Sequence, residues 1–166
     1  MPEFLTLLPP DESLALLLRN LPDPQPATET INTASALGRI TATDICAPHA
    51  LPEFQRSTVD GFAVEAADTY GASESLPAYL TLIGECPMGA TPDLEIAPTQ
   101  TAIIHTGGML PKGADAVVML EYTQTVGAGS SRPNPEIEIL RAVADGENVI
   151  LVGEDVLKDA LIKPKG

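Results

Sequence analysis

The 166-residue chain has few basic residues, and their scarcity excludes two classes of partner. Lysine and arginine together number 9 against 23 aspartates and glutamates, so the formal net charge is −14 at pH 7. A nucleic-acid-binding protein needs a basic face for the phosphate backbone, and anionic membrane surfaces attract basic segments. The composition therefore argues against nucleic acid and membrane as partners. It favours divalent cations or basic molecules.

Cysteine and histidine are equally scarce. Cys46 and Cys86 are far apart and form no CxxC pair, which argues against a disulfide framework and a zinc site. His49 and His105 have no second ligand at metal-binding spacing, so we interpret both as structural or surface residues, outside any Ser-His-Asp arrangement. The sequence also has no long apolar run and no basic N-terminal region. We expect a reduced protein of the cytoplasm with two free thiols.

Hydrophobic residues make up 44% of the chain, enough for a folded core, but 16 prolines and 13 glycines restrict it to short elements. One helix is predicted over residues 10–20, with an apolar stripe that we expect to contact the core: Leu14, Leu17, Leu18 and Leu21. Asn32 is placed to cap a short helix over residues 33–37, which Gly38 ends. Residues 40–47 are predicted to form a strand.

From Gly61 onward, short apolar runs alternate with turns rich in glycine and proline. The runs predict strands over residues 62–64, 79–83, 101–104, 116–119, 136–140 and 149–152, with a polar hairpin tip at 127–135. This pattern is typical of a small β-barrel or sandwich. We therefore expect an α+β, mostly β fold with two lobes in an elongated chain. A small α+β lobe would combine residues 1–48 and 142–166, and residues 49–141 would form an inserted, barrel-like β-rich lobe.

The segment FQRSTVDGFAV contains the first candidate site. Ser57 and Asp60 precede a predicted strand, and Gly61 follows the carboxylate in a tight turn. A carboxylate at the tip of such a turn, beside hydroxyl groups, could bind a metal ion or a water molecule. The alternative is a type I turn in which Asp60 caps its own backbone.

A second segment, IHTGGMLPKGAD, leads a predicted strand into a glycine loop. Gly107 and Gly108 allow backbone N–H groups and the Thr106 hydroxyl to approach an anion closely. The loop is not a Walker A motif, because no GKS or GKT follows it. An ordinary bulged turn is the alternative.

The third segment, VGEDV, places Glu154 and Asp155 directly after Gly153. Adjacent side chains of an extended chain point to opposite faces, so one carboxylate could be a ligand while the other is solvated. Glu121, just after the predicted strand 116–119, is a further acidic candidate. For all of these carboxylates the alternative is a solvated turn.

The order and spacing of the three segments resemble those of the molybdopterin molybdenumtransferase family (MoeA and the gephyrin E domain). Three runs carry the resemblance: LPEFQRSTVDGFAVEAADT, HTGGMLPKGADAVVMLE and GENVILVGEDV. The family pattern is close to PxFxxSxMDGYAV, then MTGAPLPxGADAVVxxE, then GEDI. The sequence keeps most of it, but His105 stands where the family usually has Met, and Gly108 where it has Ala.

The resemblance implies an enzyme that inserts molybdate into adenylylated molybdopterin with Mg²⁺, releasing AMP and the molybdenum cofactor. It implies elongated homodimers of four-domain subunits, with the active cleft between the third domain of one subunit and the second domain of its partner. Asp60, Thr106 and Asp155 would be catalytic, with Mg²⁺ at Asp60 and Asp155. The resemblance further suggests a set of cofactor-binding residues: Ser57, Gly61, Gly107, Gly108, Glu121, Gly153 and Glu154.

The resemblance implies that the chain is the N-terminal region of such an enzyme, comprising its first two domains. No glycine-rich α/β segment suited to a pterin nucleotide is present, so we expect the isolated chain to be inactive. The alternative is a protein-interaction or dimerisation module of the same fold without catalysis.

Overall fold

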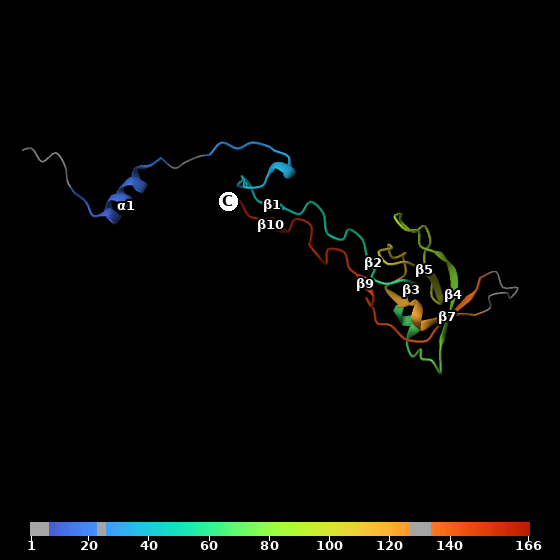
Figure 1. Cartoon of the computed structure of the whole chain (residues 1–166). Helices are drawn as coiled ribbons and strands as arrows, with labels where there is room; N and C mark the ends of the chain where they lie inside the picture. Colours follow the sequence, from blue (N-terminus) through green and yellow to red (C-terminus); the bar gives the residue numbers. More distant parts are fainter. Residues whose placement is uncertain (1–6, 23–25, 127–133) are drawn as a thin grey trace, which may run out of the picture. The chain divides into compact units, whose positions relative to one another are not determined.

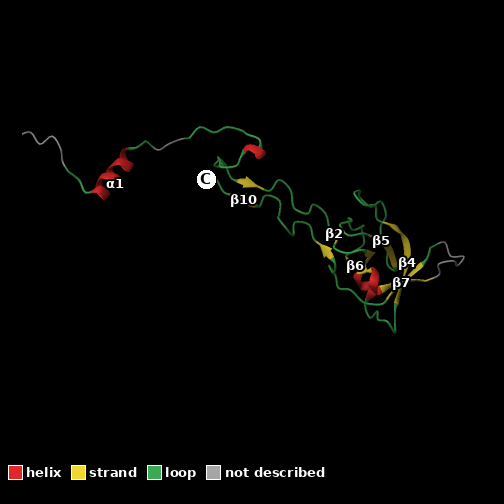
Figure 2. Ribbon diagram, in the orientation of Figure 1, coloured by secondary structure: helices red, strands yellow, loops and turns green. Residues whose placement is uncertain are grey.

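The computed structural model describes residues 7–22, 26–126 and 134–166, which Figure 1 traces along the sequence. The chain divides into two compact units, Met1–Ala42 with Gly166, and Thr43–Lys165. Figure 2 shows that strands and loops dominate over helix, so the predicted mostly β fold class is confirmed. No helix in the described parts is long and apolar enough to cross a membrane.

The first unit contains helix α1 (Pro10–Asn20). Acidic residues lie in its first turn and Arg19 in its last, as the helix dipole favours. The predicted core contact of its leucine stripe is wrong for the described structure, because no residue of α1 is buried. The four stripe leucines are between 53% and 61% exposed. The described part of residues 7–42 contains no buried residue at all, so the unit offers the stripe no core to join.

The short helix and the strand that were predicted to follow α1 are both present, but each is shorter than predicted. A 3₁₀ turn, η1 (Thr33–Ser35), begins after Asn32, whose Oδ1 accepts the Ala34 N–H at 3.0 Å. The strand predicted over residues 40–47 reduces to β1 (Ile45–Cys46), which pairs antiparallel with β10 (Leu161–Lys163). A strand requires a hydrogen-bonded neighbour, and β10 supplies one for only two of these residues.

A six-stranded sheet forms the centre of the second unit, in the order β6-β3-β5-β4-β8-β7. Strands β4 and β5 are parallel and the other neighbours are antiparallel. Its strands are β3 (Gly61–Val64), β4 (Ala78–Glu85), β5 (Gln100–Ile104), β6 (Ala116–Met119), β7 (Thr123–Val126) and β8 (Glu136–Ile139). All except the polar β7 were predicted. The tip of the β7–β8 hairpin, residues 127–133, lies outside the described residues.

Alternate residues of this sheet are buried on its two faces, as the strand period requires. Phe62 and Val64 belong to one buried cluster with Leu80 and Ile137, whereas Ala63 belongs to a second cluster with Ile104. Cys86 lies in this second cluster, and its burial, with the nearby charge of Glu85, raises the pKa of its thiol to about 11. Cys86 and the exposed Cys46 are both free.

The incoming and outgoing chains run antiparallel beside each other next to the sheet. Strand β2 (Arg56–Ser57) pairs with β9 (Val149–Ile150), and an isolated bridge joins Leu51 to Val156. In Figure 1 these segments appear in teal and red. The predicted boundaries between residues 1–48 with 142–166 and residues 49–141 remain a prediction.

Candidate functional site

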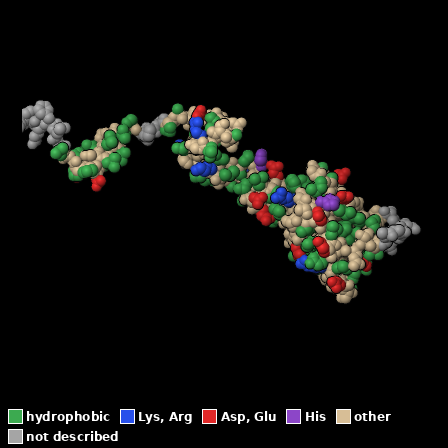
Figure 3. Space-filling view, viewed as in Figure 1, with side chains coloured by type: hydrophobic (Ala, Val, Ile, Leu, Met, Phe, Trp, Pro, Cys, Tyr) green, Lys and Arg blue, Asp and Glu red, His purple; other side chains and the backbone are tan. Residues whose placement is uncertain are grey.

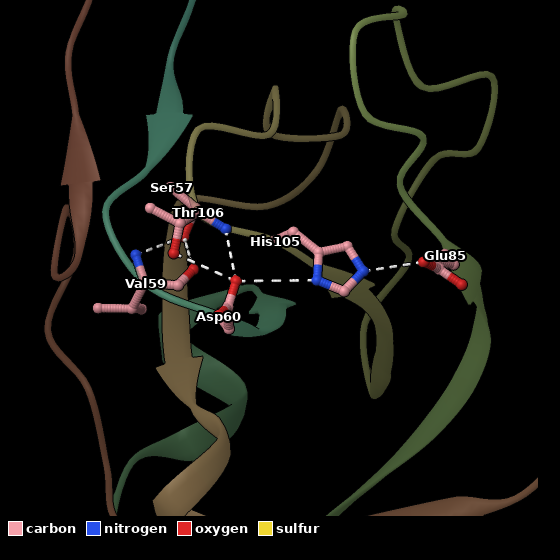
Figure 4. Close-up of polar contacts among 6 residues, drawn as sticks. All are labelled: Ser57, Val59, Asp60, Glu85, His105 and Thr106. Carbon is pink, nitrogen blue, oxygen red and sulfur yellow. Dashed lines mark hydrogen bonds and ion pairs between the residues drawn. The ribbon is translucent and has the colours of Figure 1, made fainter.

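Asp60 lies in the turn between β2 and β3, where the sheet register brings it to Thr106. Gly61 pairs with Ile104 of β5, so the residues before β3 meet those after β5. The Oδ1 atom of Asp60 accepts hydrogen bonds from the Thr106 N–H at 2.8 Å and from the Thr106 hydroxyl at 3.1 Å, as Figure 4 shows. The structure thus joins the first two sequence segments at one carboxylate.

These donors stabilise the ionised form of Asp60. Its pKa is lowered from the usual 3.8, first by the Thr106 N–H, then by the Thr106 hydroxyl, with a smaller contribution from His105. Donors to a carboxylate favour its charged state. Asp60 is therefore an anion at neutral pH, and its side chain is 57% exposed and accessible to a ligand.

His105 lies between two carboxylates, a position that the sequence did not indicate. Its Nε2 is 2.9 Å from Oε1 of Glu85, and its Nδ1 is 3.7 Å from Oδ1 of Asp60 (Figure 4). In the sequence, the only indication that His105 belongs to the site is that it directly precedes Thr106. Glu85 lies at the end of β4, far from the motifs in sequence, and only the fold brings it here.

The backbone of Ser57 connects the loop that carries Asp60 to the glycine loop. Its hydroxyl group bonds within its own loop. Its carbonyl accepts the Gly107 N–H at 2.8 Å, and its N–H donates to the Gly108 carbonyl at 3.0 Å. Its buried Oγ donates to the Val59 carbonyl at 2.6 Å and accepts the Val59 N–H at 3.2 Å. Ser57 therefore holds the loop that carries Asp60.

The N–H groups of the glycine loop are also engaged within the protein. The Gly108 N–H donates to the His105 carbonyl at 2.8 Å, in addition to the bonds of Thr106 and Gly107 already described. Gly107 has a φ of 83°, a left-handed conformation that glycine adopts without strain. The loop thus orients Asp60, and an anion bound here would need a donor from another residue.

The pairing of β3 with β6 fixes two residues next to Asp60, Gly61 and Leu120. A Cβ on Gly61 would meet the Val118 carbonyl oxygen at 2.0 Å, so this position requires glycine. The Leu120 N–H donates to the Asp60 carbonyl at 3.2 Å, which brings Glu121 of the 3₁₀ turn η3 (Leu120–Tyr122) near the site. Glu121 itself is exposed.

The third sequence segment, VGEDV, bonds to residues 51 and 52 rather than to the Asp60 turn. The Gly153 N–H donates to the Pro52 carbonyl, and the Asp155 N–H donates to the Leu51 carbonyl. Glu154 closes its own turn, because its Oε2 accepts the Leu151 N–H at 2.9 Å. No described contact joins Asp155 to Asp60. Within residues 7–22, 26–126 and 134–166, no group of three or more His, Cys, Asp or Glu residues could hold a metal ion.

A pocket of about 340 Å³ opens beside the glycine loop. It is lined by Phe54, Gly89, Ala90, Thr91, Gly107 and Met109. Sequence reasoning missed the contribution of residues 89–91, which are separated from the motifs in the chain. The pocket gives the second unit a concave surface next to the loop that holds Asp60.

Known proteins are similar to this chain over nearly its whole length. Residues 8–166 match the family model of the MoeA N-terminal region (domain I and II). The chain belongs to this family. A structure titled as a molybdopterin biosynthesis MoeA protein from Pyrococcus horikoshii superposes with a TM-score of 0.82 at 35% identity, covering 96% of this chain and 38% of that one.

Relatives of the MoeA family are also similar in sequence. A molybdopterin molybdenumtransferase of Bacillus subtilis is 39% identical over 142 residues, which is 86% of this chain. A putative molybdopterin biosynthesis protein of Methanocaldococcus jannaschii is 39% identical over 144 residues, or 87% of this chain. The chain spans 32% of the length of each of these two relatives. The expected resemblance is confirmed, and it concerns the N-terminal region of longer proteins.

Proposed function

We propose that the chain is the N-terminal part of a molybdenum cofactor biosynthesis enzyme that inserts molybdate into adenylylated molybdopterin and releases AMP. The observation that carries this proposal is the ionised Asp60 carboxylate, held by both donors of Thr106 beside the glycine loop. The names of the similar MoeA-family proteins support the reaction. The 166-residue chain would contribute one side of the active site of the longer enzyme.

The carboxylate oxygen of Asp60 that accepts no hydrogen bond suits a Mg²⁺ ion shared with a substrate. Oδ1 is occupied by Thr106, and Oδ2 has no hydrogen bond among the described residues. Mg²⁺ is usually held by one or two carboxylates together with water and substrate phosphates, so one such oxygen fits. When bound, the ion would polarise the phosphoanhydride and offset its developing charge. It would also allow anionic substrates to approach an acidic chain.

In this proposal Thr106 orients Asp60, and Ser57, Gly61, Gly107 and Gly108 set the shape of the loops around it. The second proposed metal-linked residue, Asp155, is held with Gly153 and Glu154 against Leu51 and Pro52. Because no described contact joins it to Asp60, its role would depend on another subunit or another domain. We therefore propose a homodimer, with Glu121 and the Asp155 turn facing substrate from separate positions.

The acidic charge of −14 supports a small-molecule substrate rather than nucleic acid or a membrane as partner. The two free cysteines support a reducing location, and we propose the cytoplasm.

The experiment uses the longer enzyme that carries this region. Asp60→Asn and Asp155→Asn remove one charge each, and we expect turnover to fall by roughly 10²-fold or more, about 3 kcal/mol of transition-state stabilisation. The melting temperature should change little, because both side chains are exposed. Initial rates of molybdenum cofactor formation and thermal denaturation measure the two effects.

Asp145→Asn is the matched control, since Asp145 is an exposed turn aspartate outside the site. It should leave the rate unchanged. Normal turnover with a lowered melting temperature in Asp60→Asn and Asp155→Asn would assign both residues to turn capping, which costs about 1 kcal/mol of stability. That result would favour the interaction-module alternative.

A further inference from the structure

The six-stranded sheet brings the ends of three strands together next to Asp60. Strand β5 lies between β3 and β4, antiparallel to the first and parallel to the second. The register pairs Gly61 of β3 and Glu85 of β4 with neighbouring residues at the end of β5. The start of β3 and the ends of β4 and β5 therefore lie at the same end of the sheet. His105, the first residue after β5, is consequently placed between Asp60 and Glu85 (Figure 4).

The ring of His105 is fixed by Glu85. Its Nε2 is 2.9 Å from Oε1 of Glu85. A carboxylate offers only acceptors, so Nε2 carries the hydrogen and donates it. This bond turns the Nδ1 edge of the ring towards Asp60, where Nδ1 is 3.7 Å from Oδ1. Since that separation is longer than a hydrogen bond, the ring restricts the Asp60 carboxylate by contact.

The two histidines of the chain differ in their surroundings, although both reach the surface beside acidic side chains (Figure 3). His49 is 3.6 Å from the carboxylate of Glu53, four residues later, and the two side chains are 66% and 62% exposed. His105 contacts carboxylates from two other segments of the sheet, and its side chain is 45% exposed. The contact at His49 is local in the chain, whereas the contacts at His105 depend on the fold.

The contacts that Asp60 makes through its side chain meet at one of its two oxygens. Oδ1 accepts both donors of Thr106 and faces His105, whereas Oδ2 has no hydrogen bond among the described residues. The torsion that rotates a carboxylate is broad, so the side chain by itself does not select one orientation. The two donors of Thr106 meet the same atom and leave the carboxylate free to turn about it. The ring of His105 restricts that turn.

We propose that Glu85 and His105 are a positioning pair for Asp60. Glu85 fixes the ring of His105, and the ring holds the carboxylate with Oδ1 on Thr106 and Oδ2 available to a ligand. The pair is not itself a metal site, because no group of three or more His, Cys, Asp or Glu in the described parts of the chain could hold a metal ion. Methionine, the usual residue of the family pattern at position 105, has no N–H for Glu85, so that pattern does not contain the pair.

The importance of this orientation for the reaction rests on the proposed function, whereas the orientation itself is measurable in the 166-residue chain by NMR. Three-bond couplings to Cγ of Asp60 report its χ1 rotamer, and hydrogen exchange at the Thr106 amide reports the bond to Oδ1. The wild type should show a single rotamer and a protected amide. His105→Ala should average the couplings and accelerate exchange at Thr106 by about 5-fold or more.

Three further variants test whether Glu85 acts through His105. Glu85→Ala should reproduce the changes seen in His105→Ala, and combining the two substitutions should add nothing, because the effects of such a pair are not additive. Glu85→Gln keeps an oxygen that accepts the Nε2 hydrogen and should preserve the wild-type couplings. His49→Ala is the matched control, which removes the other histidine and should change neither measurement. All of these side chains are at least partly exposed, so the fold should persist.

Wild-type couplings and exchange in His105→Ala would overturn the proposal. Additive effects in the double variant would overturn it as well, because Glu85 would then act independently of His105. A Glu85→Gln variant that behaves like Glu85→Ala would show that the bond to Nε2 is not what fixes the ring, and would also overturn the pair.

A second measurement uses the longer enzyme. His105→Ala should lower kcat by about 10-fold and leave KM for adenylylated molybdopterin within about 2-fold, because orientation is lost and substrate contacts are kept. Averaged Asp60 couplings together with normal turnover would support the positioning pair and contradict the proposed function of Asp60. Unchanged couplings together with lowered turnover would overturn the positioning pair and leave the proposed function intact.

Discussion

Thr106 supplies Asp60 with two donors of different kinds, one from the backbone and one from the side chain. The backbone donor is the larger cause of the lowered pKa of Asp60, and it survives any substitution except proline. The geometry of the loop therefore contributes more to the charge state of this carboxylate than the chemistry of the threonine does. Substitution can separate the two contributions.

Thr106→Val removes the hydroxyl donor and keeps the N–H. We expect the pKa of Asp60 to rise towards 3.8 without exceeding it, measured by carboxyl ¹³C shifts against pH. Because the folded pKa is lowered, the stability linked to Asp60 is present above the unfolded value and is lost as pH falls through the folded value. The variant should thus lose less stability than the wild type below about pH 4. Thr125→Val on β7 is the control, and an unchanged Asp60 pKa in Thr106→Val would contradict the expectation.

Gly61 allows β6 to approach β3 where the site is built. Gly61→Ala would place a Cβ 2.0 Å from the Val118 carbonyl oxygen, so the two strands must separate. We expect a loss of more than about 2 kcal/mol in the free energy of unfolding, measured by urea denaturation. In Gly84→Ala the new methyl group meets only the end of the Leu94 side chain at 3.3 Å, and the cost should be small. Equal stabilities of the two variants would contradict this account.

The elements of the two units differ in what they bury. The six-stranded sheet is covered on both faces by apolar clusters, whereas α1 buries none of its residues. Helix α1 keeps its local signals, with Pro10 at its start and acidic residues in its first turn. Helix α1 thus carries local helix signals without buried contacts, and the sheet provides the apolar burial.

A pair of leucine substitutions tests this difference. Leu80 is 1% exposed in β4, so Leu80→Ala should cost about 2–5 kcal/mol of stability. Leu17 is 57% exposed in α1, so Leu17→Ala should change the stability of the chain by less than about 0.5 kcal/mol. Denaturant unfolding followed by circular dichroism measures both. A cost at Leu17 comparable to that at Leu80 would show that the stripe is buried in solution.

At the scale of the whole chain, the two proposed metal-linked carboxylates are not joined by any described contact. Asp60 and the Asp155 turn lie on different elements, and the chain spans only 32% of the length of its relatives. We expect the purified 166-residue chain to form no molybdenum cofactor from adenylylated molybdopterin and molybdate, because it has no glycine-rich βαβ segment for a pterin nucleotide. The longer enzyme assayed in parallel is the positive control. Turnover by the chain alone would show that the active site is complete within it.

Much of the strand content could be predicted from the sequence, because short β-branched runs between glycines and prolines have few other structures available. The three motifs were correctly expected to belong to one family. Asp60 and Gly61 were both expected in a turn, whereas Gly61 is the first residue of β3. The extent of the strand at residues 40–47 and the burial of the α1 stripe were not predictable. Both depend on a partner surface that no local pattern specifies.

The sequence by itself determined the acidic charge, the short elements and the residue types at the candidate site. Tertiary structure alone decided that Thr106 donates to Asp60, that Glu85 reaches His105, and that Arg56 lies opposite Met109. It also separated the Asp155 turn from Asp60. The reason is that hydrogen bonds and strand register join residues distant in the chain, and a shift of one residue in register would reverse which side chains share a face.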